Sequence, residues 1–426
     1  MRITPEFGAP PCPASDRIAT LDIVRGVAVM GILLMNIVAF AMPSAAYYNP
    51  AAYGGAEGAD LGVWTTMFVA VDGKMRGLFS FLFGASLLLV TDRAEAKGED
   101  AGAVHYRRMG WLLLFGLAHL YLLWWGDILA HYALVGMIAF LFRDQPPHKL
   151  LILGLVCAGA GFVLLAITGA DALTLHATAH GADASADAVA GWTGYEKSFG
   201  TPPANYLAKD LAAHRGSYGD LLAWRWAHDK DSPVRTLLYV GPETLGYMLL
   251  GMAGLRSGML TGAWTRARYV KWAAIGFGVG IPGYAALAAL AIAQDFDARH
   301  VILSVLLLAA ILRPPMIAGW AALIILLARP GGRLTARIGA AGRMAFSNYL
   351  GTSLICTTLF YGYGFGLYGT LGRAELYLVV IGVWALILLW SKPWLDRFAY
   401  GPLEWLWRSL ARWKIQPFRK TRAIAT

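Results

Sequence analysis

Residues 20–40 read TLDIVRGVAVMGILLMNIVAF, an apolar run long enough to cross a membrane that also carries an acid, a base and an amide. These polar residues are Asp22, Arg25 and Asn36. On a helix, Arg25 and Asn36 lie roughly 20° apart around the axis and roughly 16 Å apart along it. Charged side chains inside a span usually face a bundle interior, because lipid solvates them poorly. The run therefore predicts a first membrane helix whose polar face lines an interior path.

The Asp22 and Arg25 pair also allows a simpler interpretation, in which it lies near the membrane surface and only orients the helix. The next residue favours a functional role. Gly26 thins the helix directly behind the arginine, so that a neighbouring element or a ligand can approach closely. We therefore expect Arg25 and Gly26 to belong to a binding site.

The composition of the chain agrees with a membrane location. Of 426 residues, 58% are hydrophobic and the mean hydropathy is +0.53, which is typical of an integral membrane protein rather than of soluble domains. The three cysteines are far apart and predict neither a disulfide framework nor a zinc site. We expect a single membrane domain over residues 1–426, with membrane lipids as its surroundings.

The net charge of +10 is explained by membrane topology and does not call for a nucleic-acid partner. Basic residues collect in every second loop and in the C-terminal tail, as expected of cytoplasmic segments. The apolar stretches predict about ten transmembrane helices, and an even number places both termini in the cytoplasm with every basic loop. The predicted spans are residues 20–40, 66–91, 108–125, 128–142, 149–168, 237–256, 270–293, 300–328, 342–361 and 375–392.

Two of these spans should be irregular. The span 66–91 carries three charged residues between positions 72 and 76, so we expect an interfacial helix that leads into a short span. The span 300–328 contains the sequence Arg313-Pro314-Pro315, and adjacent prolines predict a broken helix at that point. Broken helices are tolerated where they line a cavity. The predicted fold is therefore an all-α polytopic membrane helix bundle with some broken helices.

Two segments outside the spans differ in composition. Residues 170–236 are polar and Ala-rich and predict an outer, periplasmic insertion. Their HATAHGADASAD run brings His176 and His180 to i, i+4 spacing, but its low complexity favours a solvated helix over a metal site. Residues 393–426 mix tryptophans with basic residues and predict a cytoplasmic interfacial tail that contacts anionic lipids.

A second polar stripe runs along the third predicted span. Arg108 and His119 are eleven residues apart, the same spacing as Arg25 and Asn36, so both helices carry a base near the cytoplasm and a second polar group roughly 16 Å higher. Asp127, about two turns beyond His119, could orient or charge the imidazole. Two alternatives stay open: His119 as a structural hydrogen bond between helices, and Asp127 as a cap of the fourth helix.

A basic cytoplasmic rim, a polar path and a histidine near the outer side fit an acyl-CoA donor such as acetyl-CoA. Arginines would bind its phosphates, and a general base would activate an incoming hydroxyl or amine. His119 would deprotonate the acceptor, and Asn36, Ser347 or Asn348 would steady the developing oxyanion. The candidate residues are His119, Asp127 and Asn36 for catalysis, and Arg25, Gly26, Arg108, Arg343 and Asn348 for the donor.

Other classes of function keep or lose support on sequence grounds. The chain has no phosphate-binding Gly-rich loop, GxSxG elbow, HExxH motif or dinucleotide fingerprint, so hydrolase, NTPase and dehydrogenase hypotheses lose their usual motifs. Broken helices and intramembrane charges also fit a transporter or exporter of a small amphiphilic molecule. A non-catalytic structural membrane protein is a third possibility. The sequence leaves open the acyl chain, a homodimer, and the choice between a small-molecule and a glycan-like acceptor.

Several stretches resemble the YeiB-like family of bacterial inner-membrane proteins of unknown function. They lie in both halves of the chain: LDIVRGVAVMGILLMN, FSFLFG, GLAHLYLLWWGDILAHYALVG, RMAFSNYLGTSLICTTLFYGYGFGLYG and GPLEWLWRSL. The LDxxRGxA start is also similar to the transmembrane acyltransferase superfamily, which includes relatives of heparan-alpha-glucosaminide acetyltransferase and sugar O-acetylating membrane proteins. That resemblance implies a helix bundle that uses cytoplasmic acyl-CoA to modify a substrate on the other face of the membrane.

The chain departs from the O-acetylating members at one position. Those members carry a histidine where this chain has Asn36. Two explanations follow: either His119 replaces that histidine from another helix, or this branch does not acylate.

Overall fold

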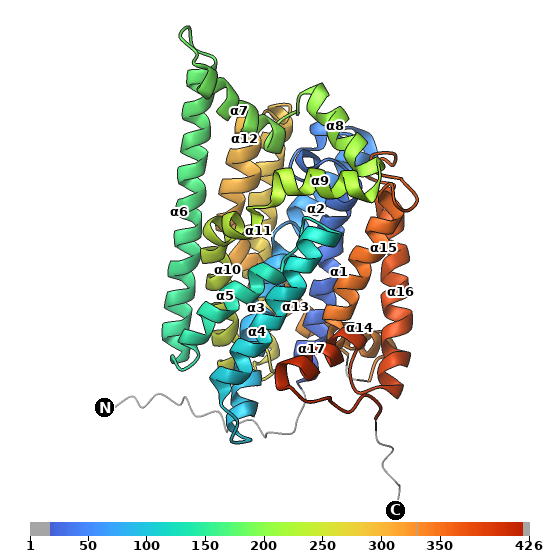
Figure 1. Ribbon diagram of the computed structural model, residues 1–426. Coiled ribbons are helices and arrows are strands. Elements are labelled where there is room, and N and C mark those ends of the chain that lie inside the picture. The colour runs from blue at the N-terminus through green and yellow to red at the C-terminus, as the bar shows by residue number, and fades with distance from the viewer. Residues whose placement is uncertain (1–17, 330, 421–426) are drawn as a thin grey trace, which may run out of the picture.

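The computed structural model describes residues 18–329 and 331–420, and this part of the chain is all-helical apart from one isolated β-bridge. The predicted all-α fold is therefore confirmed (Figure 1). Residues 1–17 and 421–426, which we expect in the cytoplasm, lie outside the described residues.

The helices follow one another along the chain without intervening strands. They are α1 (Ala19–Ala41), α2 (Gly58–Ala70), α3 (Lys74–Glu95), α4 (Ala101–Ala118), α5 (Leu129–Ala139), α6 (Pro147–Ala179), α7 (Ala186–Phe199), α8 (Ala204–Arg215), α9 (Tyr218–Asp229), α10 (Ser232–Arg256), α11 (Arg266–Ala293), α12 (Ala298–Val301), α13 (Ala309–Leu327), α14 (Arg333–Arg343), α15 (Ala345–Phe360), α16 (Leu376–Arg397) and α17 (Pro402–Arg412). Two π-helical turns, η3 (His119–Leu123) and η5 (Ile302–Leu308), extend α4 and α12. Short 3₁₀ segments are η1 (Ser44–Tyr47), η2 (Pro50–Ala52) and η4 (Phe140–Phe142).

Six helical segments of the described chain are long and apolar enough to cross a membrane. They are Ala19–Ala41, Gly58–Glu95, Pro147–Ala179, Arg266–Ala293, Ala298–Leu327 and Leu376–Arg397. The remaining predicted spans are also helical, but they are shorter or more polar: α4 with η3, α5 with η4, α10, and α14 with α15. The protein is thus a helical membrane protein whose more polar helices lie among long apolar ones.

Helix α1 lies at the centre of the bundle, and its closest neighbour is α14. A Cβ at Gly26 would collide with the carbonyl oxygen of Ile338, and a Cβ at Gly342 would collide with that of Asp22. The two backbones therefore touch, which only glycine permits at these positions. The predicted close approach at Gly26 is real, and the element that fills the space is α14.

The second predicted span is interrupted as its charges suggested. The chain turns at Gly73, which has a φ of +68°, between α2 and α3. Helix α2 packs its Trp64 and Phe68 rings against Tyr284 and Phe296 of the neighbouring layer. The prediction of a short span after the turn is wrong, because α3 has 22 residues and is long enough to cross a bilayer.

The predicted break at Arg313-Pro314-Pro315 is also wrong. Both prolines lie inside the continuous helix α13, and the irregular turn is η5, which precedes that helix. The hydroxyl of Tyr284 donates a hydrogen bond of 2.9 Å to the carbonyl of Ala309, one turn before the prolines. This bond attaches α13 to α11 just before the prolines, and the helix continues through both of them.

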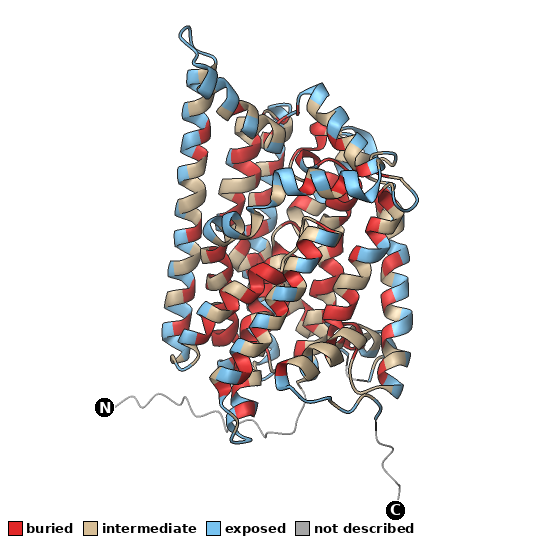
Figure 2. Cartoon of the chain, viewed as in Figure 1, coloured by how far each residue is buried: buried red, intermediate tan, exposed pale blue. Residues whose placement is uncertain are grey.

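Helix α6 runs along the edge of the bundle and is 33 residues long (Figure 1). It continues to Ala179, so the first ten residues of the predicted outer segment belong to this helix. Helices α7, α8 and α9 follow at one end of the molecule, while α14 and α17 lie at the other. Figure 2 shows the buried residues gathered in the interior helices, whereas α6 and α16 expose much of their length.

The basic loops meet at the end that holds α17. Arg412 lies 3.5 Å from Glu99, and Arg143 lies 3.5 Å from Glu95. Arg256 donates to the backbone carbonyl of Arg143 at 2.5 Å. Loops from four parts of the chain therefore share one charged rim.

Candidate functional site

The most distinctive polar pair in the interior is His119 with Asp127. Nδ1 of His119 lies 2.8 Å from Oδ1 of Asp127, and each side chain is only 1% exposed. The other carboxylate oxygen, Oδ2, accepts a hydrogen bond of 2.8 Å from the backbone N–H of Ala130 at the start of α5. Asp127 therefore both caps the helix and holds the imidazole. Nε2 of His119 is buried and has no hydrogen-bond partner within residues 18–329 and 331–420.

The π-helical turn η3 carries His119, and helix α9 holds this turn from outside. Arg225, which is 2% exposed, donates to the carbonyls of Tyr121 at 3.2 Å and Leu123 at 3.1 Å. The hydroxyl of Tyr218 donates to the carbonyl of Leu122 at 2.7 Å. These bonds satisfy carbonyls at the end of the helix, which otherwise have no partner. Helix α9 thus fixes the segment that positions the histidine, rather than lying free on the membrane surface.

The upper part of α1 and the end of α4 meet through two aromatic rings. Phe40 stacks on Trp124 with ring centroids 3.8 Å apart, and Trp124 in turn lies 6.1 Å from the His119 ring. Asn36 lies one turn before Phe40 and is half-buried. In the described part of the chain its amide makes no hydrogen bond. The ring of Trp124 therefore connects the upper part of α1 with the turn that carries His119.

The basic ends of the two stripes lie close to α17. The guanidinium of Arg108 stacks at 4.2 Å over the Trp407 ring, and the Trp407 indole donates to the Arg108 carbonyl at 2.9 Å. Arg408 is exposed on one side, and the protein around it removes part of its hydration. This desolvation lowers the pKa of the Arg408 guanidinium, and so do the positive charges of Arg412 and Arg25. Four arginines therefore gather where α1, α4 and α17 meet.

Arg25 has local partners in this cluster. Its guanidinium donates to Oδ1 of Asp22 at 3.2 Å and to Oγ of Ser86 at 2.8 Å. The predicted Asp22 and Arg25 pair is thus present. Arg343 is half-buried at the end of α14.

Asn348 is engaged on all sides by neighbouring helices. Its amide nitrogen donates to the Ala341 carbonyl at 3.0 Å and to Oγ of Ser391 at 3.2 Å, and its oxygen accepts from the Trp390 indole at 3.0 Å. Asn348 therefore links α14, α15 and α16 through three hydrogen bonds.

Ser347, the other predicted oxyanion group, binds the carboxylate of Glu404 from α17. Its hydroxyl donates to Oε2 at 2.5 Å, while Oε1 accepts from the backbone N–H groups of Phe346 and Ser347 at 2.8 and 3.0 Å. A carboxylate at this position satisfies the free N–H groups at the start of α15 and complements its dipole. The GPLEWLWRSL stretch is therefore a cap for another helix.

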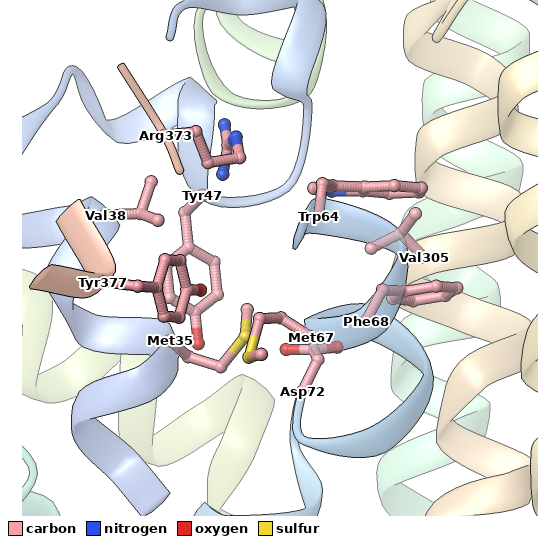
Figure 3. Close-up of a pocket in the computed structure, with 10 residues that line it drawn as sticks. All are labelled: Met35, Val38, Tyr47, Trp64, Met67, Phe68, Asp72, Val305, Arg373 and Tyr377. Atoms are coloured by element: carbon pink, nitrogen blue, oxygen red, sulfur yellow. The ribbon is translucent and has the colours of Figure 1, made fainter. Parts of the chain in front are cut away.

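A small enclosed cavity lies on a different side of α1. Its walls include Asp72 and Arg373 together with aromatic side chains and two methionines (Figure 3). Neither His119 nor Asp127 lines this cavity.

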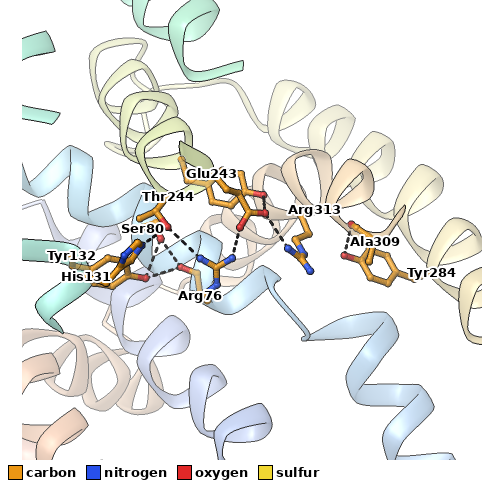
Figure 4. A network of polar contacts seen from close by, with 10 residues as sticks. Arg76, Ser80, His131, Tyr132, Glu243, Thr244, Tyr284, Ala309 and Arg313 are labelled. Carbon is orange, nitrogen blue, oxygen red and sulfur yellow. Dashed lines mark hydrogen bonds and ion pairs between the residues drawn. The ribbon is translucent and has the colours of Figure 1, made fainter. Parts of the chain in front are cut away.

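A network of charged residues crosses the middle of the bundle (Figure 4). The carboxylate of Glu243 in α10 pairs with Arg76 of α3, and lies 3.0 Å from Arg313 of α13. Arg76 also lies 3.3 Å from Oγ1 of Thr244, which is 2.9 Å from Nε2 of His131. One buried acid thus holds two arginines from different helices, and the network reaches α5 one turn after Asp127.

Sequence reasoning missed Glu243 and Arg225. Glu243 follows Pro242 inside an otherwise apolar span, and an acid in such a place is a signal by itself. Arg225 sits in an amphipathic stretch and resembles any surface arginine, so the sequence gives no sign that it is buried. No group of three or more His, Cys, Asp or Glu that could hold a metal occurs among the described residues, which include His176 and His180.

The apolar helices, the buried ion pairs and the His119–Asp127 pair define a polytopic α-helical membrane protein with a polar interior. Residues 255–414 match the family described as "Protein of unknown function (DUF418)". "Uncharacterized protein YeiB" of Escherichia coli strain K12 is 35% identical over 408 residues, which cover 93% of this chain and 96% of that protein. "Uncharacterized protein YxaH" of Bacillus subtilis strain 168 is 30% identical over 440 residues, covering 97% and 99%. The chain belongs to the YeiB-like family. No solved structure matches it.

Proposed function

We propose that this protein is a membrane-embedded acyltransferase that uses cytoplasmic acyl-CoA, such as acetyl-CoA, to acylate a hydroxyl or amine at the outer face. One observation carries the proposal: the His119 imidazole is held through Nδ1 by a buried carboxylate, while its Nε2 is buried without a partner. A carboxylate that accepts from Nδ1–H leaves the lone pair on Nε2, which is the arrangement of a general base.

The chemistry assigned to His119 is a pair of proton transfers. Nε2 takes the proton of the acceptor as its oxygen or nitrogen attacks the thioester carbonyl, and the Asp127 carboxylate stabilises the imidazolium. The half-buried Asn36 amide is the candidate donor to the oxyanion. When the carbon–sulfur bond breaks, Nε2–H returns its proton to the leaving thiolate, and the ester or amide product and the free thiol remain.

The arginine cluster is the proposed donor mouth. Arg25, Arg108 and Arg408 suit the phosphates of a coenzyme A donor, because guanidinium groups bind phosphate oxygens in pairs. The positive-inside rule puts this rim in the cytoplasm of a bacterial inner membrane and α7 to α9 in the periplasm. Ten membrane crossings with both termini inside complete the proposed topology.

Transport is the second candidate, and the mid-depth network favours it. Charged residues at such depth commonly line the paths of ions or substrates. An apolar groove of about 340 Å³ between α6, α10 and α13 reaches Glu243 and Tyr247 of this network. A transporter of a small amphiphilic molecule would use these residues without needing an acyl donor.

Binding of acetyl-CoA to purified, detergent-solubilised protein separates the two candidates. An acyltransferase should show a saturable rise in melting temperature with acetyl-CoA, because a ligand that binds only the folded state stabilises it. The rise should be lost in Arg108→Ala and kept in Arg266→Ala, an exposed arginine of α11 outside the cluster. No rise with acetyl-CoA or longer acyl-CoAs in a folded sample would favour transport.

Transfer itself needs a second assay with a matched histidine control. Membranes that contain the protein should move label from radioactive acetyl-CoA to an acceptor, and His119→Ala should abolish this. His214→Ala is the control and should keep the transfer, because Nδ1 of His214 lies 2.7 Å from Oδ1 of Asp210 in another buried pair. The imidazole ring of His214 stacks on the ring of Tyr368, which covers one of its faces. Equal rates for wild type and His119→Ala would overturn the catalytic assignment.

A further inference from the structure

The cavity beside Asp72 is closed by the helices α1, α2 and α16 together with several irregular elements. It lies between α1, the segment η1, the turn from α2 to α3, the π-helical turn η5 and the chain around Arg373. Figure 3 shows Arg373 at one end, Asp72 at the other, and Tyr47 between them. Irregular backbone at membrane depth is tolerated where it surrounds a cavity. The construction of these walls is therefore that of a site rather than of a packing defect.

The two ends of the cavity carry opposite charges, and each of these groups has one buried atom without a hydrogen bond. Oδ2 of Asp72 and Nε of Arg373 are buried without hydrogen bonds in the described residues, and the two residues are 4% and 2% exposed. Nη2 of Arg373 donates to the carbonyl of Ala46 at 2.8 Å, which fixes the side chain and leaves Nε unused. Unpaired buried polar groups of this kind destabilise a fold, and more so when they are charged. Something polar belongs between them.

Lys74 and Arg313 attract the charge of Asp72, but neither forms a hydrogen bond with its carboxylate. The ammonium of Lys74 is used by the Phe68 carbonyl at 2.6 Å and lies 3.0 Å from the centroid of the Tyr284 ring. Arg313 pairs with Glu243. Asp72 forms no ion pair in the described part of the chain, so its carboxylate keeps an acceptor for a group in the cavity.

The cavity is separate from the His119 pair because α1 stands between them. Asn36 shares the face of Arg25, whereas Met35 and Val38, which line the cavity, lie about 100° and 160° away around the helix. An occupant of the cavity therefore cannot reach His119 from this side. Binding in the cavity is therefore independent of acyl transfer at His119.

We propose that this cavity binds a small zwitterion, with its ammonium group on Asp72 and its anionic oxygens on Arg373. A ligand with a single charge could pair with only one of the two residues. A molecule that carries both charges pairs with Asp72 and Arg373 at the same time. The aromatic side chains of Trp64 and Phe68 close one wall and exclude water from the pair. A water-excluded setting strengthens both ionic contacts.

The present form of the cavity is nearly closed. Its free volume is about 10 Å³, close to the minimum that holds one water. Met35 and Met67 project into it, and methionine side chains adapt their shape at low cost. The smallest zwitterion, glycine, is therefore the first probe, and movement of the two thioethers would make room for it.

The test is the melting temperature of the purified full-length protein with glycine, acetate or methylammonium at equal concentrations. We expect a saturable rise with glycine and none with acetate or methylammonium, which carry one charge each. Asp72→Asn and Arg373→Gln should each abolish the rise. Asp183→Asn and Arg266→Gln, which change exposed residues outside the cavity, should keep it.

A second kind of variant fills the cavity and keeps both Asp72 and Arg373. Val305→Phe places a ring in the cavity wall, so it should remove the glycine effect even where Asp72→Asn fails to fold. The absence of any rise in the wild-type protein would overturn the proposal, and so would a rise that persists in Asp72→Asn or Val305→Phe. In either case the cavity would hold only water.

Discussion

Nδ1 of His119 lies 2.8 Å from Oδ1 of Asp127, across the tight turn that joins α4 to α5. The first prediction follows from this contact. In Asp127→Asn the amide can donate to Nδ1, which moves the imidazole proton to Nε2 and removes the base. We expect the rate of acyl transfer to fall roughly 10²- to 10⁴-fold, measured as initial rates with labelled acetyl-CoA.

A stability measurement accompanies that prediction. The asparagine oxygen can still accept from the Ala130 N–H, so Asp127→Asn should keep nearly the wild-type melting temperature. Asp127→Ala loses the cap as well and should cost about 1 kcal/mol more. A wild-type transfer rate in Asp127→Asn would show that the carboxylate only caps α5.

Removal of the charge on Glu243 should be among the most damaging single changes. In Glu243→Gln the buried guanidinium of Arg313 and the partly exposed guanidinium of Arg76 lose the carboxylate that pairs with both. Breaking a buried ion pair in this way costs about 3–5 kcal/mol. We expect a large drop in melting temperature and loss of monodisperse protein in detergent. Glu375→Gln is the control, since this exposed carboxylate serves one backbone N–H and should change the melting temperature little.

The contact between α1 and α14 predicts that a single methyl group is too large at Gly26. Gly26→Ala would press against the backbone of Ile338, and overpacking typically costs about 1–3 kcal/mol. Gly278→Ala in α11 meets open space, so it should be neutral or slightly stabilising through its better helix propensity. Equal melting temperatures for the two variants would mean that the helices separate easily at this crossing.

Glu404 predicts a pH effect on stability. Burial raises its pKa above the usual value of 4.5, against the hydrogen bonds from Ser347 and its neighbours, which lower it. The folded state therefore binds this proton more readily than the unfolded state. The resulting stability is fully present below the unfolded pKa and is lost as the pH rises through the raised folded-state pKa.

The check is a series of melting temperatures at increasing pH. The wild-type value should decline across the raised pKa of Glu404, and Glu404→Gln, which cannot titrate, should lack this part of the decline. Glu404→Ala removes the acceptor of two backbone N–H groups and should lower the melting temperature at every pH. An identical pH profile for wild type and Glu404→Gln would assign the dependence to another group.

Local patterns predicted much of the fold. The first helix was expected over 20–40 and runs from Ala19 to Ala41, because apolar composition and length decide such a segment on their own. His119 and Asp127 could be paired from sequence since only eight residues separate them. The continuous path of α13 through two prolines could not, because adjacent prolines by themselves favour a break.

Long-range partners account for what the sequence did not predict in the candidate site. Glu243 lies 167 residues after Arg76, and no sequence pattern indicates that one carboxylate pairs with two arginines. The oxygen of Asn348 accepts a hydrogen bond from a tryptophan 42 residues later, a contact that the sequence does not indicate. Such contacts depend on how helices are placed around one another, which hydropathy does not encode.

The cap on α15 also sets an order of events during synthesis. The first N–H groups of this helix are satisfied by Glu404, which lies 58 residues after Phe346 and 57 after Ser347. At translation rates of 5–20 residues per second, roughly 3–12 s pass before that carboxylate has been made. The beginning of α15 therefore waits in an unfinished state after it enters the membrane, and a chain that stops before residue 404 leaves an earlier helix, rather than only its own end, incomplete.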